Sequence, residues 1–289
     1  MNGILNIYKS EGMTSFDVVR KVKKIAKCTR VGHTGTLDPL AIGVLPVCIG
    51  KATKAVELLT CDSKVYRTTL KLGVTTDTYD KEGKILKESV VDVDEKEVVE
   101  VVNSFKGAQM QKPPIYSAIR VNGKRLYEYA REGKEVEIKE REIFIHDIQI
   151  LDINLPYVSL EINCSKGTYI RSICYDIGEK LGCGAAMWEL ERISSGAFKK
   201  ENSISIEDLN EENLEANLIT MEIAFKELDE IKLNEKFTKL AINGVCIQDK
   251  KVSSKIKNDI LYRVLSDKGE FIGIGKNIQG GLKIVKLFI

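Results

Sequence analysis

The sequence predicts a mixed α/β protein: a domain built on a mainly antiparallel sheet flanked by helices, followed by a small β-barrel. Three patterns predict this fold class. Residues 64–72 alternate between apolar and polar positions, as a half-buried strand does. Residues 14–26 carry apolar side chains at helical spacing. Residues 231–289 contain short β-rich runs separated by turns with glycine, which is typical of a small all-β module.

The individual elements follow from local signals along the chain. Thr14 and Asp17 resemble a capping box at the start of the first helix. The proline-rich residues 112–117 favour no regular structure. The remaining predicted elements are strands at 44–49, 64–72 and 158–164, helices that begin at Asp94 and Tyr169, and C-terminal strands at 261–265, 271–274 and 282–288.

Composition sets the class of protein. Of 289 residues, 43% are hydrophobic and 30% are charged, as in an ordinary soluble globular protein, and no apolar run reaches the ~20 residues that span a membrane. The N-terminus lacks a signal pattern. Seven cysteines without a Cys-x-x-Cys motif favour a reducing cytoplasm and argue against disulfides or zinc. With two histidines, a histidine-rich metal site is not expected.

Charge is unevenly distributed along the chain. Residues 9–54 hold nine Lys/Arg against three acids, and residues 231–289 hold twelve against five. Between them, residues 201–230 hold ten acids and one lysine. Two basic regions separated by an acidic one suit a polyanion that lies across two surfaces, although ordinary solvated faces explain the counts equally well.

Basic and aromatic residues also alternate within residues 113–141. Such interleaving suits single-stranded RNA, because bases stack on rings while phosphates meet cations. Nearby glutamates dilute the signal. The residues concerned are Arg120, Lys124, Arg125 and Arg131 with Tyr116, Tyr127 and Tyr129.

Asp38 is the most informative acid in the chain. It lies among glycines in a loop that precedes a buried strand, and Pro39 pushes it towards extended geometry. The residue is either a turn former or a nucleophile. Tyr66 shares the inward face of its strand with leucines and is either a core or a site residue. Arg171 lies close to an apolar helix stripe, so it needs a partner such as an inward carboxylate.

Taken together, these segments resemble the TruB family of tRNA pseudouridine synthases over essentially the whole chain. One departure is Ser10, where the family usually has proline, and this is expected to loosen the loop. The matching segments are Lys9 with Gly12-Met-Thr-Ser15, Gly32-His-Thr-Gly-Thr-Leu-Asp-Pro39, Tyr66 in Lys-Val-Tyr-Arg, Pro113-Pro-Ile-Tyr-Ser-Ala118, residues 123–131, Lys166-Gly-Thr-Tyr-Ile-Arg171 and Leu190-Glu-Arg192.

The resemblance implies isomerisation of uridine to pseudouridine at position 55 in the T-loop of tRNA, without cofactor or metal. Asp38 is then the nucleophile, attacking either the uracil ring or the sugar. Arg171 keeps Asp38 ionised, and Tyr66 stacks on the flipped uracil and assists proton transfer. The further site residues that the resemblance implies are His33, which fills the space left by the flipped base, Tyr169 and Leu190, which line the pocket, Lys9 and Lys54, which support the site or bind phosphate, and Asp80, which organises the pocket.

The resemblance also implies an organisation and a partner. Residues 1–228 are expected to form the catalytic domain, with an RNA-binding insertion at 113–141, and residues 229–289 a PUA-like RNA-binding domain. The protein is expected to be a cytoplasmic monomer that binds the T-arm stem-loop. Two alternatives remain: the catalytic subunit of an RNA-guided pseudouridylation particle, and an RNA-binding or RNA-folding protein without enzymatic activity.

Overall fold

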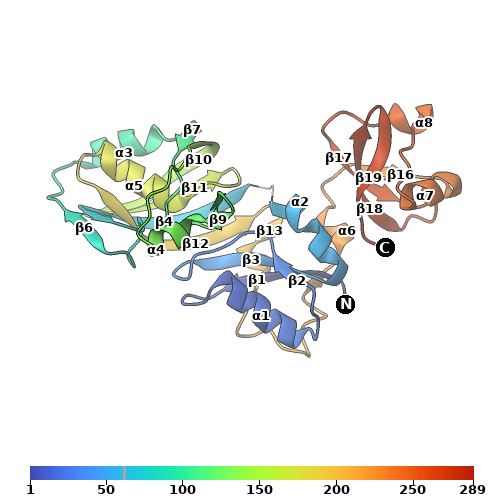
Figure 1. Cartoon of the computed structure of the whole chain (residues 1–289), viewed down its shortest axis with the longest axis horizontal. Helices are drawn as coiled ribbons and strands as arrows, with labels where there is room; N and C mark the ends of the chain where they lie inside the picture. Colours follow the sequence, from blue (N-terminus) through green and yellow to red (C-terminus); the bar gives the residue numbers. More distant parts are fainter. Residues whose placement is uncertain (61–62) are drawn as a thin grey trace.

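The computed structural model describes residues 1–60 and 63–289 and has the predicted mixed α/β class (Figure 1). Eleven strands form one large sheet, and four C-terminal strands form a second sheet. The main path of the large sheet runs β14-β1-β3-β12-β4-β11-β10-β7. Among the strand pairs of the described residues, only β1–β14 and β12–β3 are parallel in this sheet, so it is mainly antiparallel as predicted.

The strands of the large sheet vary greatly in length. They are β1 (Gly3–Lys9), β2 (Val31–His33), β3 (Ile42–Ile49), β4 (Lys64–Leu72), β7 (Gly107–Gln111), β10 (Arg141–Asn154), β11 (Tyr157–Cys164), β12 (Ala185–Ser195), β13 (Phe198–Lys199), β14 (Ile204–Ser205) and β15 (Leu218–Ile219). Two small hairpins pair β5 (Val74–Thr76) with β6 (Ile85–Glu88) and β8 (Arg120–Val121) with β9 (Lys124–Arg125). The C-terminal sheet contains β16 (Glu230–Lys232), β17 (Leu261–Leu265), β18 (Phe271–Ile278) and β19 (Gly281–Leu287).

The helices are short, and among the described residues four of them pack on the large sheet, including α6, which contacts β1. Helix α1 contacts β2, α3 contacts β10, and α5 contacts β12 and β4. The helical segments are α1 (Ser15–Ile25), η1 (Gly50–Ala55), α2 (Val56–Thr60), α3 (Glu95–Asn103), α4 (Leu126–Arg131), α5 (Ile170–Lys180), η2 (Lys200–Asn202), α6 (Met221–Ala224), α7 (Glu235–Ile242) and α8 (Lys250–Ser253). Among the described residues, none of these helices is long and apolar enough to span a membrane.

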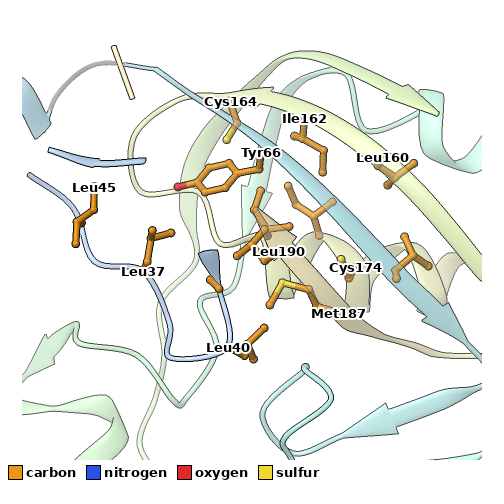
Figure 2. Close-up of a cluster of buried hydrophobic side chains, with 14 of the residues drawn as sticks. Leu37, Leu40, Leu45, Tyr66, Leu160, Ile162, Cys164, Cys174, Met187 and Leu190 are labelled. Atoms are coloured by element: carbon orange, nitrogen blue, oxygen red, sulfur yellow. The ribbon is translucent and has the colours of Figure 1, made fainter. Parts of the chain in front are cut away.

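Local sequence explains where the elements begin and which way they face. Thr14 and Asp17 form the predicted capping box of α1, each side chain bonding the backbone of the other. Strand β4 occupies the predicted residues 64–72, and its inward side chains Tyr66, Leu70 and Leu72 are buried. These side chains belong to the main cluster of buried apolar residues. Figure 2 shows Tyr66 within this cluster, with its hydroxyl directed towards the side where Leu37 and Leu45 lie. The alternation of β4 therefore places the Tyr66 phenol at the edge of the hydrophobic core.

A second hydrophobic cluster joins the C-terminal sheet to the large one. It contains buried residues of β3 and η1, Phe225 beside α6, and Ile274 of β18. The rings of Phe225 and Phe288 stack with centroids 6.3 Å apart. Lys54 Nζ donates to the Leu287 carbonyl oxygen at 3.1 Å, so polar contacts reinforce the apolar contact between the two sheets.

Helix α4 lies in residues 113–141, where no helix was predicted from the sequence. Leu126, at its start, is fully buried and anchors it. Residues 112–117 have no regular structure, as predicted, and neither do residues 118 and 119. All six described cysteines are free, whereas Cys61 lies outside the described residues.

Candidate active site

A cavity of about 850 Å³ opens where the loop before β3 faces β4, β12 and the start of α5. Its lining includes Asp38, Tyr66 and Arg171, the three residues singled out from the sequence. His33, Tyr169 and Leu190 also line the cavity. The fold thus gathers side chains that are separated by more than a hundred residues in the chain.

The loop that carries Asp38 is fixed by hydrogen bonds to its backbone. The Ser15 hydroxyl lies 2.8 Å from the Leu37 amide nitrogen and 3.1 Å from the Leu37 carbonyl oxygen, accepting from the first and donating to the second. The Gly12 amide donates to the Pro39 carbonyl at 2.9 Å. Because the residues on both sides of Asp38 are held, its carboxylate has little freedom to leave the cavity.

Lys9 also holds this loop in place. Its side chain is fully buried, and Nζ donates to the carbonyl oxygens of Ser10, Met13 and Pro39 at 2.9, 2.8 and 3.2 Å. Burial lowers the pKa of Lys9 to about 8, opposed by the charge of Asp38. Lys9 therefore supports the site through the backbone and is not exposed for phosphate binding.

Arg171 makes several polar contacts at the inner end of the cavity, which we call its floor. Its Nε lies 3.0 Å from Asp38 Oδ2, an ionic contact without hydrogen-bond alignment, while NH2 donates to Asp38 Oδ1 at 3.3 Å. NH2 also donates to the Tyr116 carbonyl at 2.9 Å, and NH1 donates to the Thr78 carbonyl at 3.1 Å. NH1 lies 3.4 Å from Asp80 Oδ2. The buried guanidinium is thus shared between two carboxylates and two carbonyls.

The Asp38 carboxylate experiences opposing influences on its pKa. Burial raises the pKa most, and Asp80 adds to this; Arg171 is the strongest opposing influence, followed by Lys9. The net direction is upward, although 32% of the side chain stays open to the cavity. An acid that is surrounded by protein yet reachable from one side is suited to react with a bound substrate.

Tyr66 and Arg192 both line the cavity. Burial raises the pKa of Tyr66, and the neighbouring Arg192 opposes this shift. Arg192 is 1% exposed, and its guanidinium donates to the carbonyls of Val44 and Gly35 at 2.7 and 3.1 Å. The raised pKa keeps the Tyr66 phenol protonated near neutral pH, so it can donate a hydrogen bond but cannot act as a base.

His33 lies at the side of the cavity in a neutral form. Its Nδ1 accepts a hydrogen bond from the Gly35 amide at 3.3 Å. Burial lowers its pKa, and the positive charge of Arg192 lowers it further.

Three predicted site residues lie outside the cavity lining: Lys9, described above, Asp80 and Lys54. Asp80 is buried behind Arg171, where its Oδ1 accepts from the Thr78 hydroxyl at 2.6 Å. Lys54 is not brought to the cavity at all, because its Nζ binds the Leu287 carbonyl. The described residues contain no group of three His, Cys, Asp or Glu side chains that could hold a metal ion.

Sequence reasoning missed several contributors to the site. Arg192 was noted within a motif but given no role, although a buried arginine in a strand signals a need for partners. The carbonyl oxygens of Tyr116 and Thr78 that contact Arg171 belong to the backbone, so no side-chain pattern in the sequence indicates them. Ser10 donates to Glu207 at 2.7 Å, so the residue that replaces the usual proline ties the loop down instead of only loosening it.

Comparison with known families agrees with this architecture. Residues 23–170 match the N-terminal domain model of the TruB family pseudouridylate synthases, and residues 171–230 match the tRNA pseudouridylate synthase B C-terminal domain. The border between the two models falls at the start of α5, and strands on both sides of this border belong to the same large sheet. The chain belongs to the TruB family, and it is a pseudouridine synthase, an enzyme that isomerises uridine to pseudouridine.

Individual relatives are similar over their full length. The chain is 54% identical to tRNA pseudouridine synthase B of Clostridium tetani, covering 100% of both chains, and 53% identical to the same enzyme of Clostridium acetobutylicum, covering 99% of both. Among solved structures it resembles a Cbf5-Nop10-Gar1 complex (TM-score 0.77, 28% identity, 99% of this chain and 85% of that one). It also resembles an H/ACA RNP bound to a substrate RNA containing 2'-deoxyuridine (TM-score 0.74, 26% identity, again 99% and 85%).

Proposed function

We propose that this enzyme converts the uridine at position 55 in the T-loop of tRNA to pseudouridine, with Asp38 as the nucleophile. The observation that carries the proposal is the Asp38–Arg171 ion pair at 3.0 Å in a cavity walled by Tyr66. Relatives at 54% and 53% identity carry the name tRNA pseudouridine synthase B, which supports tRNA as the substrate.

The chemistry required is the exchange of one bond for another at the same ribose carbon. The glycosidic bond between N1 and C1′ breaks, the uracil turns, and C5 bonds to C1′. The hydrogen on C5 leaves as a proton, and N1 gains one, so no electrons are gained or lost. Asp38 attacks either the uracil ring or the sugar to allow the base to detach and turn.

Each neighbour of Asp38 contributes through its position. Arg171 favours the ionised carboxylate and fixes its orientation. Tyr66 stacks on the extruded uracil, and Tyr169 and Leu190 complete the pocket. Asp80 and the Thr78 carbonyl hold the far side of Arg171. The neutral His33 takes the place of the flipped base in the loop.

Recognition of the RNA is assigned to surfaces around this pocket. Residues 113–141 place Arg125 and Tyr127 in the cavity lining, which supports an RNA-binding role for this segment. We assign residues 1–228 to the catalytic domain and residues 229–289 to a PUA-like RNA-binding domain that acts in a cytoplasmic monomer. The β-rich C-terminal sheet and its basic composition support that assignment.

The test is release of tritium from a T-arm hairpin that carries 5-tritiated uridine, with no guide RNA present. Bond formation at C5 displaces the label, so release measures the chemistry directly. We expect release by the unaltered enzyme and a loss of at least about 10³-fold in Asp38→Asn, which removes the nucleophile while keeping the shape. Asp147→Asn is the matched control, because this exposed β10 carboxylate pairs with Lys106 outside the cavity lining.

The alternatives predict different results. Tight binding without release by any variant would favour a protein that only binds or folds RNA. Release that requires an added guide RNA would favour a subunit of a guided particle. Full activity in Asp38→Asn would show that the nucleophile is another group.

A further inference from the structure

One exposed face of α1 begins with an aromatic ring at the mouth of the cavity. Phe16 lines the cavity, yet 59% of its surface is exposed. It lies in the first turn of α1, on the face opposite the buried Val18 and Val22. Packing therefore does not explain a phenylalanine here, since the core contacts of this helix are made by other residues.

Two cations continue the same face of the helix. Arg20 and Lys24 follow Phe16 at successive intervals of four residues, which places them in one row along the helix axis. Both are exposed, as Phe16 is. We define the α1 stripe as Phe16, Arg20 and Lys24. The row starts at the cavity mouth and leads away from it.

Local contacts hold the first two members of the stripe in place. The Arg20 guanidinium carbon lies 5.4 Å from the centroid of the Phe16 ring, a cation–π distance. Arg20 also forms an ion pair with Asp17, the residue that caps the helix. The guanidinium has five donors, so these contacts leave some of them for a further ligand. Lys24 makes no ion pair within the described residues.

We propose that the α1 stripe is an RNA subsite, in which Phe16 stacks on a nucleobase next to the flipped uridine and Arg20 and Lys24 contact the phosphates that follow. This inference rests on the proposed function, since it takes the flipped uridine to lie at Asp38. An aromatic ring followed by cations matches nucleic acid in both of its features, because the ring takes a base and the cations take the backbone. Across the cavity mouth, Tyr127 repeats this pairing of a ring with arginines: Arg125 and Arg131 lie 5.8 and 5.2 Å from its centroid.

The test uses an unmodified T-arm hairpin with 2-aminopurine replacing, in separate molecules, the nucleotide on either side of the target uridine. Stacking quenches 2-aminopurine, so its fluorescence in the complex reports contact with a ring independently of catalysis. We expect quenching at one of the two positions with the unaltered enzyme, its loss in Phe16→Ala, and its retention in Phe16→Trp. Binding of the hairpin by Phe16→Ala should weaken about tenfold, the scale of one lost base–ring stack.

A control and a second readout separate stacking from general damage. Phe144 is an exposed aromatic on β10 outside the cavity lining, so Phe144→Ala should leave quenching and affinity unchanged. Lys24→Gln should reduce the slope of log affinity against log salt by roughly one, as expected for one lost phosphate contact. Single-turnover tritium release by Phe144→Ala should match that of the unaltered enzyme, whereas Phe16→Ala should need about tenfold more RNA for half-maximal release.

Two failures are distinguishable. If the unaltered enzyme binds the hairpin and releases no tritium, the proposed function fails, whatever the fluorescence shows. If it releases tritium while Phe16→Ala keeps full quenching and affinity, the proposed function stands and the α1 stripe is not an RNA subsite.

Discussion

The floor and the mouth of the cavity differ in how their charges are held. At the floor, the buried Arg171 and Lys9 direct their donors at backbone carbonyls and the carboxylates of Asp38 and Asp80. At the mouth, Arg20 and Arg125 are exposed and lie against the rings of Phe16 and Tyr127. Buried charges interact strongly with their partners, and the loss of one partner is costly. Exposed charged side chains can change position, and salt screens their interactions. The floor therefore suits chemistry and the mouth suits recognition.

The largest effect in this comparison is expected from Arg171→Lys at the floor. A lysine keeps the positive charge but lacks the planar fork that reaches Asp38 and the carbonyls of Thr78 and Tyr116 together. We expect the rate of tritium release at saturating RNA to fall by about 10²-fold, the cost of misplacing a reacting group. Unchanged activity would mean that positive charge alone is sufficient at the floor.

A smaller effect, on binding only, is expected from Arg125→Ala at the mouth. Arg125 lines the cavity while exposed, so its removal should raise the KM for the hairpin by about fivefold and leave kcat nearly unchanged. The loss should shrink as salt rises. A variant that lowers kcat with no change in KM would contradict the division between floor and mouth.

The pH dependence of activity in Asp80→Asn tests how the charges at the cavity floor set the pKa of Asp38. In the proposed mechanism Asp38 acts in its ionised form, so its raised pKa should place the acid limb of activity above the usual pKa of an aspartate. Because the Asp80 charge contributes to that rise, Asp80→Asn should move the acid limb of single-turnover activity to lower pH. Arg171→Lys should move it the opposite way, since the variant keeps the charge but loses the hydrogen bond by which Arg171 also lowers the pKa of Asp38. A shift of both variants in the same direction would contradict this electrostatic account.

The smallest effect is expected from Ser10→Ala, which removes an exposed hydrogen bond to Glu207. We expect the free energy of unfolding to change by no more than about 0.5 kcal/mol, as for most surface substitutions. Chemical denaturation measures the change. A large loss of stability would show that this one bond, rather than Lys9, holds the loop before Asp38.

Much of this fold could be predicted from the sequence because its signals are local. The capping box of α1 and the alternation of β4 each lie within ten residues, and both appear in the structure as predicted. The pairing of Arg171 with a carboxylate followed from the cost of burying a lone guanidinium. These predictions needed no knowledge of which segments meet in space.

Other features depend on long-range packing or on the backbone and could not be predicted. The parallel pairing of β3 with β12 joins residues about 150 positions apart, and no local pattern encodes it. The carbonyls that surround Lys9 and Arg171 carry no residue-specific signal. Lys54 was assigned to the site from the family resemblance, yet it lies in η1, where its Nζ donates to the Leu287 carbonyl beside the C-terminal sheet.

The hydrophobic cluster shared by the two sheets has a consequence for how the chain can be divided. A chain ending near residue 228 loses Ile274 and Phe288, which cover Phe225 and the buried residues of η1. The apolar surface left bare would favour aggregation over a smaller working enzyme. The C-terminal sheet has a hydrophobic core of its own, yet it also covers part of the catalytic core, so we expect its removal to lower the stability of the part that remains.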